Sequence, residues 1–156
     1  MQIGDGATLE WLRFSDFSAP LLYELLRFRQ AIFVVEQSSP YPDLDGLDQR
    51  AEHLLLRVDE GLAGCLRLIP YPDEARVAIG RLAVAAPLRR RGFARLMMAE
   101  ALARCQRDRG DHAISLSAQT YLTPLYESLG FRAISEPFDD YGLSHVAMAL
   151  AKPVLD

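Results

Sequence analysis

The sequence predicts an α/β (α+β) protein with a single central mixed, mostly antiparallel sheet flanked by helices. Two observations support this fold class. Apolar strand patterns alternate along the chain with amphipathic helical patterns. No repeat, linker or low-complexity segment interrupts the 156 residues, and this length suits one domain over 1–156.

The elements are expected in the order strand, helix, three strands, helix, strand, helix and two strands. The strand patterns occupy 7–14, 51–58, 62–70, 76–84, 112–118, 131–135 and 143–151. The helical patterns occupy 18–37, 88–109 and 121–130, with Ser18 as a cap of the first helix and glycines ending the other two. The strand at 76–84 is almost continuously apolar, so we expect both of its faces to be covered.

Composition indicates a soluble globular protein and argues against several partners. The net charge of −4 disfavours nucleic acid, because domains that bind it are usually basic. No apolar run is long enough to span a membrane and the first residues do not resemble a signal peptide, so we expect no membrane partner and a cytoplasmic location. Cys65 and Cys105 are expected to be buried free thiols, with no metal or redox motif around them.

The segment PLRRRGFARLMM, residues 87–98, carries the strongest chemical signal. It follows the apolar strand directly and begins a helical pattern, and the start of a helix offers unpaired N–H groups to an anion. Gly92 lets backbone approach a phosphate closely, and Ala94 is nearly as small. The alternative, a solvated basic helix start, is electrostatically unfavourable. The pattern lacks the glycines of a dinucleotide fingerprint and the Gly-Lys-Ser/Thr of a phosphate-binding loop.

Three segments resemble the GNAT N-acetyltransferase superfamily. The spacing Val84-x-x-Pro87-x-Arg89-x-x-Gly92-x-Ala94 is similar to its pyrophosphate-binding motif. The segment QTYLTPLYESLGF, 119–131, resembles its second signature, and LRFRQAIFVVEQSSPYPDLDGLD, 26–48, resembles its ElaA-like subgroup. The resemblance covers about 7–150 and implies the GNAT fold, in which the fourth and fifth strands splay apart and hold acetyl-CoA between them.

The resemblance also implies roles for individual residues. Backbone groups of Leu82 and Val84 would pair with the pantetheine arm of acetyl-CoA, Gln119 would touch that arm, and Tyr126 would protonate the departing thiolate. The pyrophosphate would be held by the amides of Arg89, Arg90, Arg91, Gly92, Phe93, Ala94 and Arg95. No metal is implied.

The base that would deprotonate an acceptor amine stays open at this stage. Glu36, at the end of the first helical pattern, and His53, at the start of a strand, are the candidates that we name as catalytic with Tyr126. Either could instead be structural, Glu36 as an exposed carboxylate and His53 as a hydrogen-bonded strand residue. His145 occupies a similar strand position with a weaker case, and a water chain is a further alternative.

The loop sequence PDLDGLD has three alternative interpretations. Its aspartates, Asp43, Asp45 and Asp48, could cap backbone in a turn, bind calcium or form a negative surface that attracts a cationic amine. Calcium is disfavoured because the register of an EF-hand is absent. Arg67 and Arg81, inside apolar strands, could be paired structural cations or could point into a cleft.

Together these features predict an N-acetyltransferase that moves an acetyl group from acetyl-CoA to a primary amine by direct attack in a ternary complex. The amine is expected to be cationic, and a homodimer is possible by analogy with the superfamily. A non-catalytic acyl-CoA-binding module of the same fold is the main alternative. A nucleic-acid-binding domain and a nucleotide-binding enzyme are less favoured.

Overall fold

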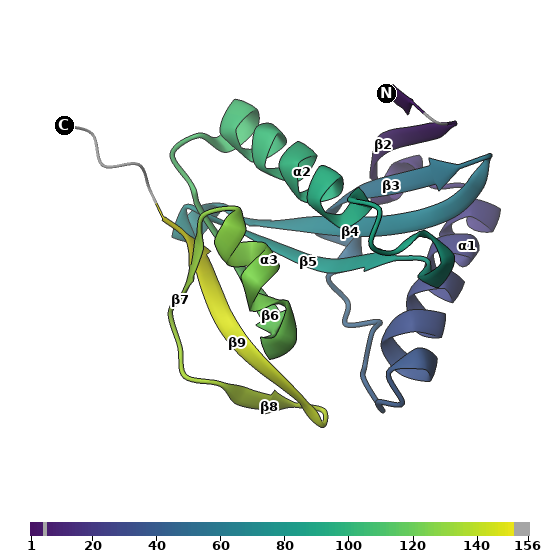
Figure 1. Cartoon of the computed structure of the whole chain (residues 1–156). Helices are drawn as coiled ribbons and strands as arrows, with labels where there is room; N and C mark the ends of the chain where they lie inside the picture. Colours follow the sequence, from purple (N-terminus) through teal and green to yellow (C-terminus); the bar gives the residue numbers. More distant parts are fainter. Residues whose placement is uncertain (5, 152–156) are drawn as a thin grey trace.

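The computed structural model of the chain describes residues 1–4 and 6–151 (Figure 1). Its strands are β1 (Gln2–Gly4), β2 (Ala7–Arg13), β3 (Glu52–Val58), β4 (Gly61–Tyr71), β5 (Arg76–Val84), β6 (Ala113–Gln119), β7 (Phe131–Ala133), β8 (Phe138–Asp140) and β9 (Leu143–Leu150). Its α-helices are α1 (Ala19–Gln30), α2 (Phe93–Arg109) and α3 (Thr123–Ser128). A π-helical segment, η2 (Ala31–Glu36), continues α1. All seven expected strands are present, and two short ones, β1 and β8, were not anticipated.

The strands form one mixed sheet in the order β1-β2-β3-β4-β5-β6-β9-β7, with β8 also paired to β9. Among the described residues every strand pair is antiparallel except β5 with β6. The predicted fold class is therefore confirmed. The short β-hairpin from β3 to β4 and the long return from β5 through α2 to β6 give this mixture of directions.

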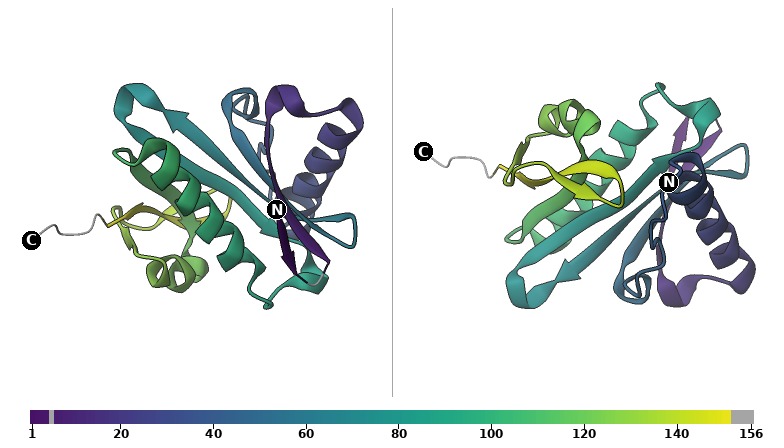
Figure 2. Two further views of the ribbon diagram at one scale, coloured as in Figure 1. Left: turned by 90° about the horizontal axis from the view of Figure 1, so that it is seen from above. Right: turned by 90° about the horizontal axis from the view of Figure 1, so that it is seen from below.

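Helices cover both faces of the centre of the sheet, which explains the continuous apolar runs in β3 to β5. On β3, Leu54 and Leu56 belong to the cluster that packs under α2, whereas Leu55 between them belongs to the cluster under α1. In the view from above in Figure 2, α2 crosses in front of the strands and α1 lies at the side of the molecule. On the α1 side, the apolar cluster between the helix and the sheet extends as far as Cys65 of β4 and Ala83 of β5 and ends there.

The sheet splays where β5 leaves β6. The two strands pair only from Arg76 opposite Ala113 to Ile79 opposite Leu116. Beyond that point a bulge shifts the register of β5 against β4, and Arg81 within the bulge has a left-handed φ of 53°. The rest of β5 therefore has a backbone edge that β6 does not use. Figure 1 shows β6 and β9 turning away from β5 at this place, and the expected splay between the fourth and fifth predicted strands is confirmed.

Helix boundaries differ from the predictions for identifiable reasons. The first predicted helix changes from α to π geometry after Gln30, so its last six residues form wider turns. The second begins at Phe93, five residues later than predicted. Arg90 and Gly92 have φ values of 64° and 84°, which a right-handed helix cannot contain. The three consecutive arginines therefore precede the helix instead of opening it.

We predict that Gly64→Ala destabilises the fold while Gly80→Ala does not. A Cβ at Gly64 would lie 3.0 Å from both the carbonyl oxygen of Ala83 and Sδ of Met97, whereas one at Gly80 meets nothing within 4 Å. Overpacking of this kind costs about 1–3 kcal/mol. Urea denaturation of both variants would measure the difference, and equal stabilities would contradict the packing at Gly64.

Candidate active site

The main cleft lies at the splay and has a volume of about 470 Å³. Its walls come from η2, the unpaired edge of β5, the start of α2, the end of β6 and α3. Of the residues predicted from the sequence, the cleft brings together Glu36, Leu82, Val84, Arg89, Arg90, Gly92, Phe93, Ala94, Arg95, Gln119 and Tyr126. Arg91 and His53 do not line it. Residues up to 90 positions apart in the chain thus lie around one cleft, as the prediction of a single site requires.

Backbone amides are available at the α2 end of the main cleft. The first intrahelical bond of α2 runs from the amide of Leu96 to the carbonyl of Gly92 at 3.0 Å. The amides of Phe93, Ala94 and Arg95 therefore have no acceptor within the helix. A Cβ at Gly92 would meet nothing within 4 Å, so the backbone there faces open space. Free amides and open space at a helix N-terminus are the features that an anion site would use.

The arginine side chains around these amides are differently engaged. Arg89 folds back: its Nε donates to the carbonyl of Val84 at 2.8 Å and its Nη2 lies 2.8 Å from Oε2 of Glu36. Arg95 donates to Oγ of Ser128 at 2.7 Å. The Arg91 guanidinium sits 5.5 Å from the ring centre of Phe93 and is exposed. Glu36 is therefore one half of a surface ion pair at the rim of the cleft.

Tyr126 reaches the main cleft from α3. Its side chain is buried and packs edge-on against Phe131, with ring centres 6.1 Å apart. Burial raises the pKa of the Tyr126 phenol to about 12, so the hydroxyl stays protonated well above neutral pH. A protonated phenol in a cleft is suited to donate a proton.

Two further hollows continue from the main cleft toward the α1 side of the sheet. A connecting cavity of about 100 Å³ shares Leu82, Gln119 and Tyr126 with the main cleft. It opens into a groove of about 500 Å³, which we call the open-face groove. Gly80, Arg81 and His145 line both the cavity and the groove. A passage therefore runs through the splay from one face of the sheet to the other.

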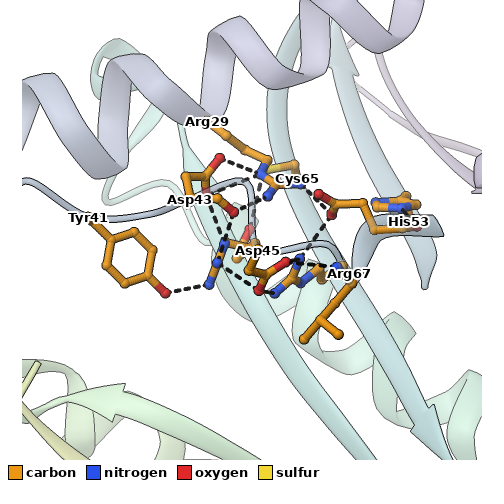
Figure 3. Close-up of polar contacts among 10 residues, drawn as sticks. Arg29, Tyr41, Asp43, Asp45, His53, Cys65 and Arg67 are labelled. Atoms are coloured by element: carbon orange, nitrogen blue, oxygen red, sulfur yellow. Dashed lines mark hydrogen bonds and ion pairs between the residues drawn. The ribbon is translucent and has the colours of Figure 1, made fainter. Parts of the chain in front are cut away.

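A cluster of six charged side chains, which we call the ion network, forms one wall beside this passage (Figure 3). It comprises Arg29 from α1, Arg67 from β4, Arg81 from β5, and Asp43, Asp45 and Asp48 from the loop after η2. Arg29, 1% exposed, lies 3.0 Å from Asp43 through Nε and 2.7 Å from Asp48 through Nη1.

The remaining ion pairs tie the loop to the sheet. Nη1 of Arg67 lies 3.0 Å from the Asp48 carboxylate, and Nε of Arg81 lies 2.8 Å from that of Asp43. Arg81 also donates to the phenol oxygen of Tyr41 at 2.6 Å. Asp45 also accepts from the Leu47 amide at 3.1 Å, so one aspartate caps backbone as the turn interpretation predicted. Three cations match three anions, so the aspartates present no free negative charge. The interpretation of this loop as a negative surface for a cationic amine is therefore wrong, and the two strand arginines are paired cations.

The arginines of the ion network lower the pKa values of Asp45 and Asp48 despite burial. Burial by itself would raise the pKa of Asp48, but hydrogen bonds and charge from Arg29 and Arg67 outweigh it and lower that pKa. For Asp45, the bonds from Arg67 and the Leu47 amide outweigh burial and lower the pKa to about 2. Asp45 and Asp48 are therefore ionised at neutral pH.

His53 lies behind the ion network, away from all three hollows. It is 2% exposed, packs edge-on against Phe17, and its Nε2 lies 3.0 Å from the carbonyl oxygen of Asp48. Because a carbonyl only accepts hydrogen bonds, Nε2 donates. Burial lowers the pKa of His53, so the ring is neutral near pH 7. The structure gives this histidine a place in the support of the loop and no access to the cleft.

Sequence reasoning missed Arg29 and Tyr41. Arg29 follows the buried Leu25 by four positions, so it lies on the apolar stripe of α1 and could have been recognised as a buried cation needing a partner. Nothing local distinguished Tyr41. The two cysteines are buried and unpaired as predicted, and burial raises the pKa of Cys65 to about 12 and that of Cys105 to about 11.

Within residues 1–4 and 6–151, no group of three or more His, Cys, Asp or Glu side chains is placed to hold a metal ion. None of the helices in that same part of the chain is both long enough and apolar enough to cross a membrane.

Comparison with known proteins identifies the class to which this fold and cleft belong. Residues 29–152 match the family described as the acetyltransferase (GNAT) domain, and the chain belongs to this family. It therefore has the acyl-CoA N-acyltransferase fold.

Within the family the chain resembles ElaA, which confirms the resemblance stated from the sequence. It is 35% identical to Protein ElaA of Escherichia coli over 146 residues, covering 90% of this chain and 95% of that protein. The crystal structure of that ElaA superposes with a TM-score of 0.87 over 93% of this chain and 99% of that one. A UPF0039 protein of Mycobacterium bovis is 40% identical over 138 residues, covering 85% of this chain and 86% of that protein.

A second solved structure carries a functional name. An acyl-CoA N-acyltransferase from Pseudomonas aeruginosa is 33% identical, with a TM-score of 0.87, over 93% of this chain and 99% of that one.

We predict that Asp48→Asn lowers the free energy of unfolding by about 3–5 kcal/mol at pH 7, because it leaves two buried guanidinium groups underpaired. The folded-state pKa of Asp48 lies below its unfolded value, so this contribution is present above about pH 4 and is lost as the pH falls further. Denaturation at pH 7 and pH 3 should show the gap to wild type narrowing in acid.

Asp45→Asn is the matched control, because its side chain is 25% exposed and its loss should cost less. A gap between Asp48→Asn and wild type that is equally wide at both pH values would show that the charge of Asp48 is not what stabilises the loop.

Proposed function

We propose that this protein transfers an acetyl group from acetyl-CoA to a primary amine by direct attack in a ternary complex. The observation that carries the proposal is the main cleft itself. It joins free helix-terminal amides, an unpaired strand edge and a protonated phenol in one volume of about 470 Å³. These are the groups that a thioester carrying a pyrophosphate and an amide-containing arm would need.

The residues present fit coenzyme A. The amides of Phe93, Ala94 and Arg95 suit the pyrophosphate, and the open space at Gly92 admits it. The edge of β5 at Leu82 and Val84 can pair with the amides of the pantetheine arm, as an added strand would. Gln119 lies on the opposite wall, within reach of the same arm.

Backbone and side chains divide the work of phosphate binding. Because Arg89 is held by Val84 and Glu36, it contributes a fixed positive field rather than a mobile contact. Arg90 and Arg91, whose side chains are exposed, add positive electrostatic potential from the solvent side of the cleft. Glu36 then acts by positioning Arg89, and its carboxylate is already committed to that ion pair.

The proton that the departing thiolate needs is assigned to Tyr126. The raised pKa keeps the phenol protonated, and Tyr126 lines both the main cleft and the connecting cavity. Orientation of amine and thioester in adjoining hollows supplies much of the remaining rate. A non-catalytic acyl-CoA-binding module of the same fold would bind acetyl-CoA without turnover for any amine.

We predict that Gly92→Asp weakens acetyl-CoA binding by roughly 10- to 100-fold more than Gly92→Asn does. Gly92 has a φ of 84°, and asparagine and aspartate tolerate this region about equally. The two variants therefore differ mainly by a negative charge beside the pyrophosphate. Isothermal titration calorimetry with acetyl-CoA would measure both affinities.

Arg90→Ala serves as a second comparison, because its side chain is exposed and should be the most replaceable of the three consecutive arginines. If Arg90→Ala abolished binding and Gly92→Asp did not, the assignment of the pyrophosphate to backbone amides would be wrong.

We predict that Tyr126→Phe lowers kcat by roughly 10²- to 10⁴-fold and leaves the acetyl-CoA affinity unchanged, because only the proton donor is lost. With the phenol pKa raised to about 12, the loss should be similar at all pH values in the assay range. Release of free thiol from acetyl-CoA would report turnover, with the exposed Tyr23→Phe as control. Unchanged turnover of the Tyr126 variant would rule out its role as the acid.

A further inference from the structure

The open-face groove is the part of the sheet that α1 does not cover. Alternation along the strands sends Val77 and Ile79 of β5, and Leu116 of β6, into the core under α2. The residues between them face the other way, and most are small. The floor of the groove is made by Ala78, Gly80, Ser115, Ser117 and Ala147. Small side chains leave room for a ligand against the backbone.

The walls of the groove are larger and polar, and they include His145 of β9. His145 stands directly opposite Gln119 of β6 in the antiparallel register, so both side chains project from the same face. Gln119 lines the main cleft, and Tyr126 lines the connecting cavity together with His145. His145 is thus next to the place where the groove meets the proposed acetyl site.

The tautomer of His145 is determined by its own backbone. Nδ1 lies 2.9 Å from the carbonyl oxygen of Leu143, which accepts and cannot donate. Nδ1 therefore carries the hydrogen, and in the neutral ring Nε2 holds the lone pair. The ring also stacks on Phe138, with centres 6.1 Å apart and planes at 27°, which fixes its orientation.

The other candidate bases are committed elsewhere. Glu36 is paired with Arg89 at the opposite end of the main cleft, and His53 is buried behind the ion network. Burial raises the pKa of the Tyr41 phenol, which makes it a poor base near neutral pH. Of the groups placed at the passage, Nε2 of His145 has the right chemistry.

A negative charge is present in the groove at Asp140 of β8. The carboxylate is close enough to Tyr41 to add to the rise of that phenol's pKa, which burial mainly causes. In the described part of the chain no arginine, lysine or histidine forms an ion pair with it. Of the groove arginines, by contrast, Arg67 and Arg81 are neutralised by the ion network, and Arg76 pairs with Glu74 at 2.8 Å. Asp140 therefore remains to attract a cation.

We propose that the open-face groove is the acceptor site, that Asp140 selects an amine in its ammonium form, and that Nε2 of His145 removes its proton. This inference rests on the proposed acetyl transfer and adds the acceptor's binding place, its charge class and the base. A cationic amine is thus expected again, but because of Asp140 and not because of the aspartates of the ion network.

The proton balance of the step is complete. The ammonium gives one proton to Nε2 of His145, and the neutral nitrogen attacks the thioester carbonyl carbon. The N–C bond forms, the C–S bond breaks, and the thiolate takes the phenolic proton of Tyr126. The phenolate regains a proton from the new amide nitrogen, and His145 releases its proton to water. Ammonium and thioester give amide, thiol and one proton.

The test measures acetyl-CoA turnover with spermidine, glucosamine and lysine amide as acceptors over a range of pH. His145→Asn keeps a donor near the Nδ1 position and removes the base. We expect kcat to fall by roughly 10²- to 10⁴-fold near pH 7, less at high pH where the amine is already neutral. His145→Ala should be partly rescued by added imidazole. His112→Asn, at the far end of α2, should leave turnover unchanged.

Several titratable and charged groups near His145 can also affect how turnover depends on pH. They are Asp140 from β8, Tyr41 from the loop, Arg81 from β5 and Tyr126 from α3. Asp140→Asn should raise KM for the polycation spermidine more than for the monocation glucosamine and leave the shape of the profile intact. If the fall in kcat on the acidic side of the pH profile disappeared in His145→Asn but not in Asp140→Asn, that fall would be assigned to the histidine.

Gly80→Leu tests the location independently. The position has no positive φ and nothing within 4 Å of a built Cβ, so the larger side chain should fill the groove without loss of fold. Acetyl-CoA binding should persist while KM for the acceptor rises at least about tenfold, a cost of roughly 1.4 kcal/mol.

The outcomes separate the two proposals. Suppose that the wild-type enzyme turns over one of these amines. Full activity of His145→Asn, or an unchanged acceptor KM in Gly80→Leu, would then overturn the acceptor site and leave acetyl transfer standing. Tight acetyl-CoA binding with no turnover for any of the three amines would overturn acetyl transfer, and the acceptor site with it.

Discussion

The ion network is the interaction on which the geometry of the site depends. It joins three segments that no continuous secondary structure connects: α1 through Arg29, the central strands through Arg67 and Arg81, and the aspartate loop between them. Buried ion pairs contribute little net stability, because the desolvation of each ion offsets most of the attraction. Their value here is positional. A loop with three buried or half-buried carboxylates can lie against these arginines in very few ways.

That constraint shapes the passage through the sheet. Arg81 lies in the bulge that turns β5 away from β6, and its guanidinium is held by Asp43 and Tyr41 on the facing loop. The same contacts hold Tyr41 at the wall of the open-face groove. Under the proposed function the two faces of one sheet would share the work: helix-terminal amides would hold the phosphates on the α2 side, and the groove around His145 would hold the acceptor on the other.

Much of the fold and half of the site could be predicted from local pattern. Alternating and continuous apolar runs identified seven strands, and the spacing of Arg89, Gly92 and Ala94 indicated the turn before α2 whose amides line the main cleft. The start of α2 was predicted too early because composition does not reveal that Arg90 adopts a left-handed backbone. Reasoning from the sequence ranked His53 above His145, because both occupy strands and only the packed sheet shows that His53 is buried while His145 lines the connecting cavity.

The sequence alone determined the fold class, because this depends on the periodicity of apolar residues, and its resemblance to the GNAT superfamily gave the family and, apart from Glu36, the predicted residues that line the main cleft. Tertiary structure decided how the charges are used. Asp43, Asp45 and Asp48 look acidic as a string of residues, yet arginines from 14 to 38 positions away neutralise them. Electrostatic energy depends on distance in space and on burial, and both are set only when the elements pack.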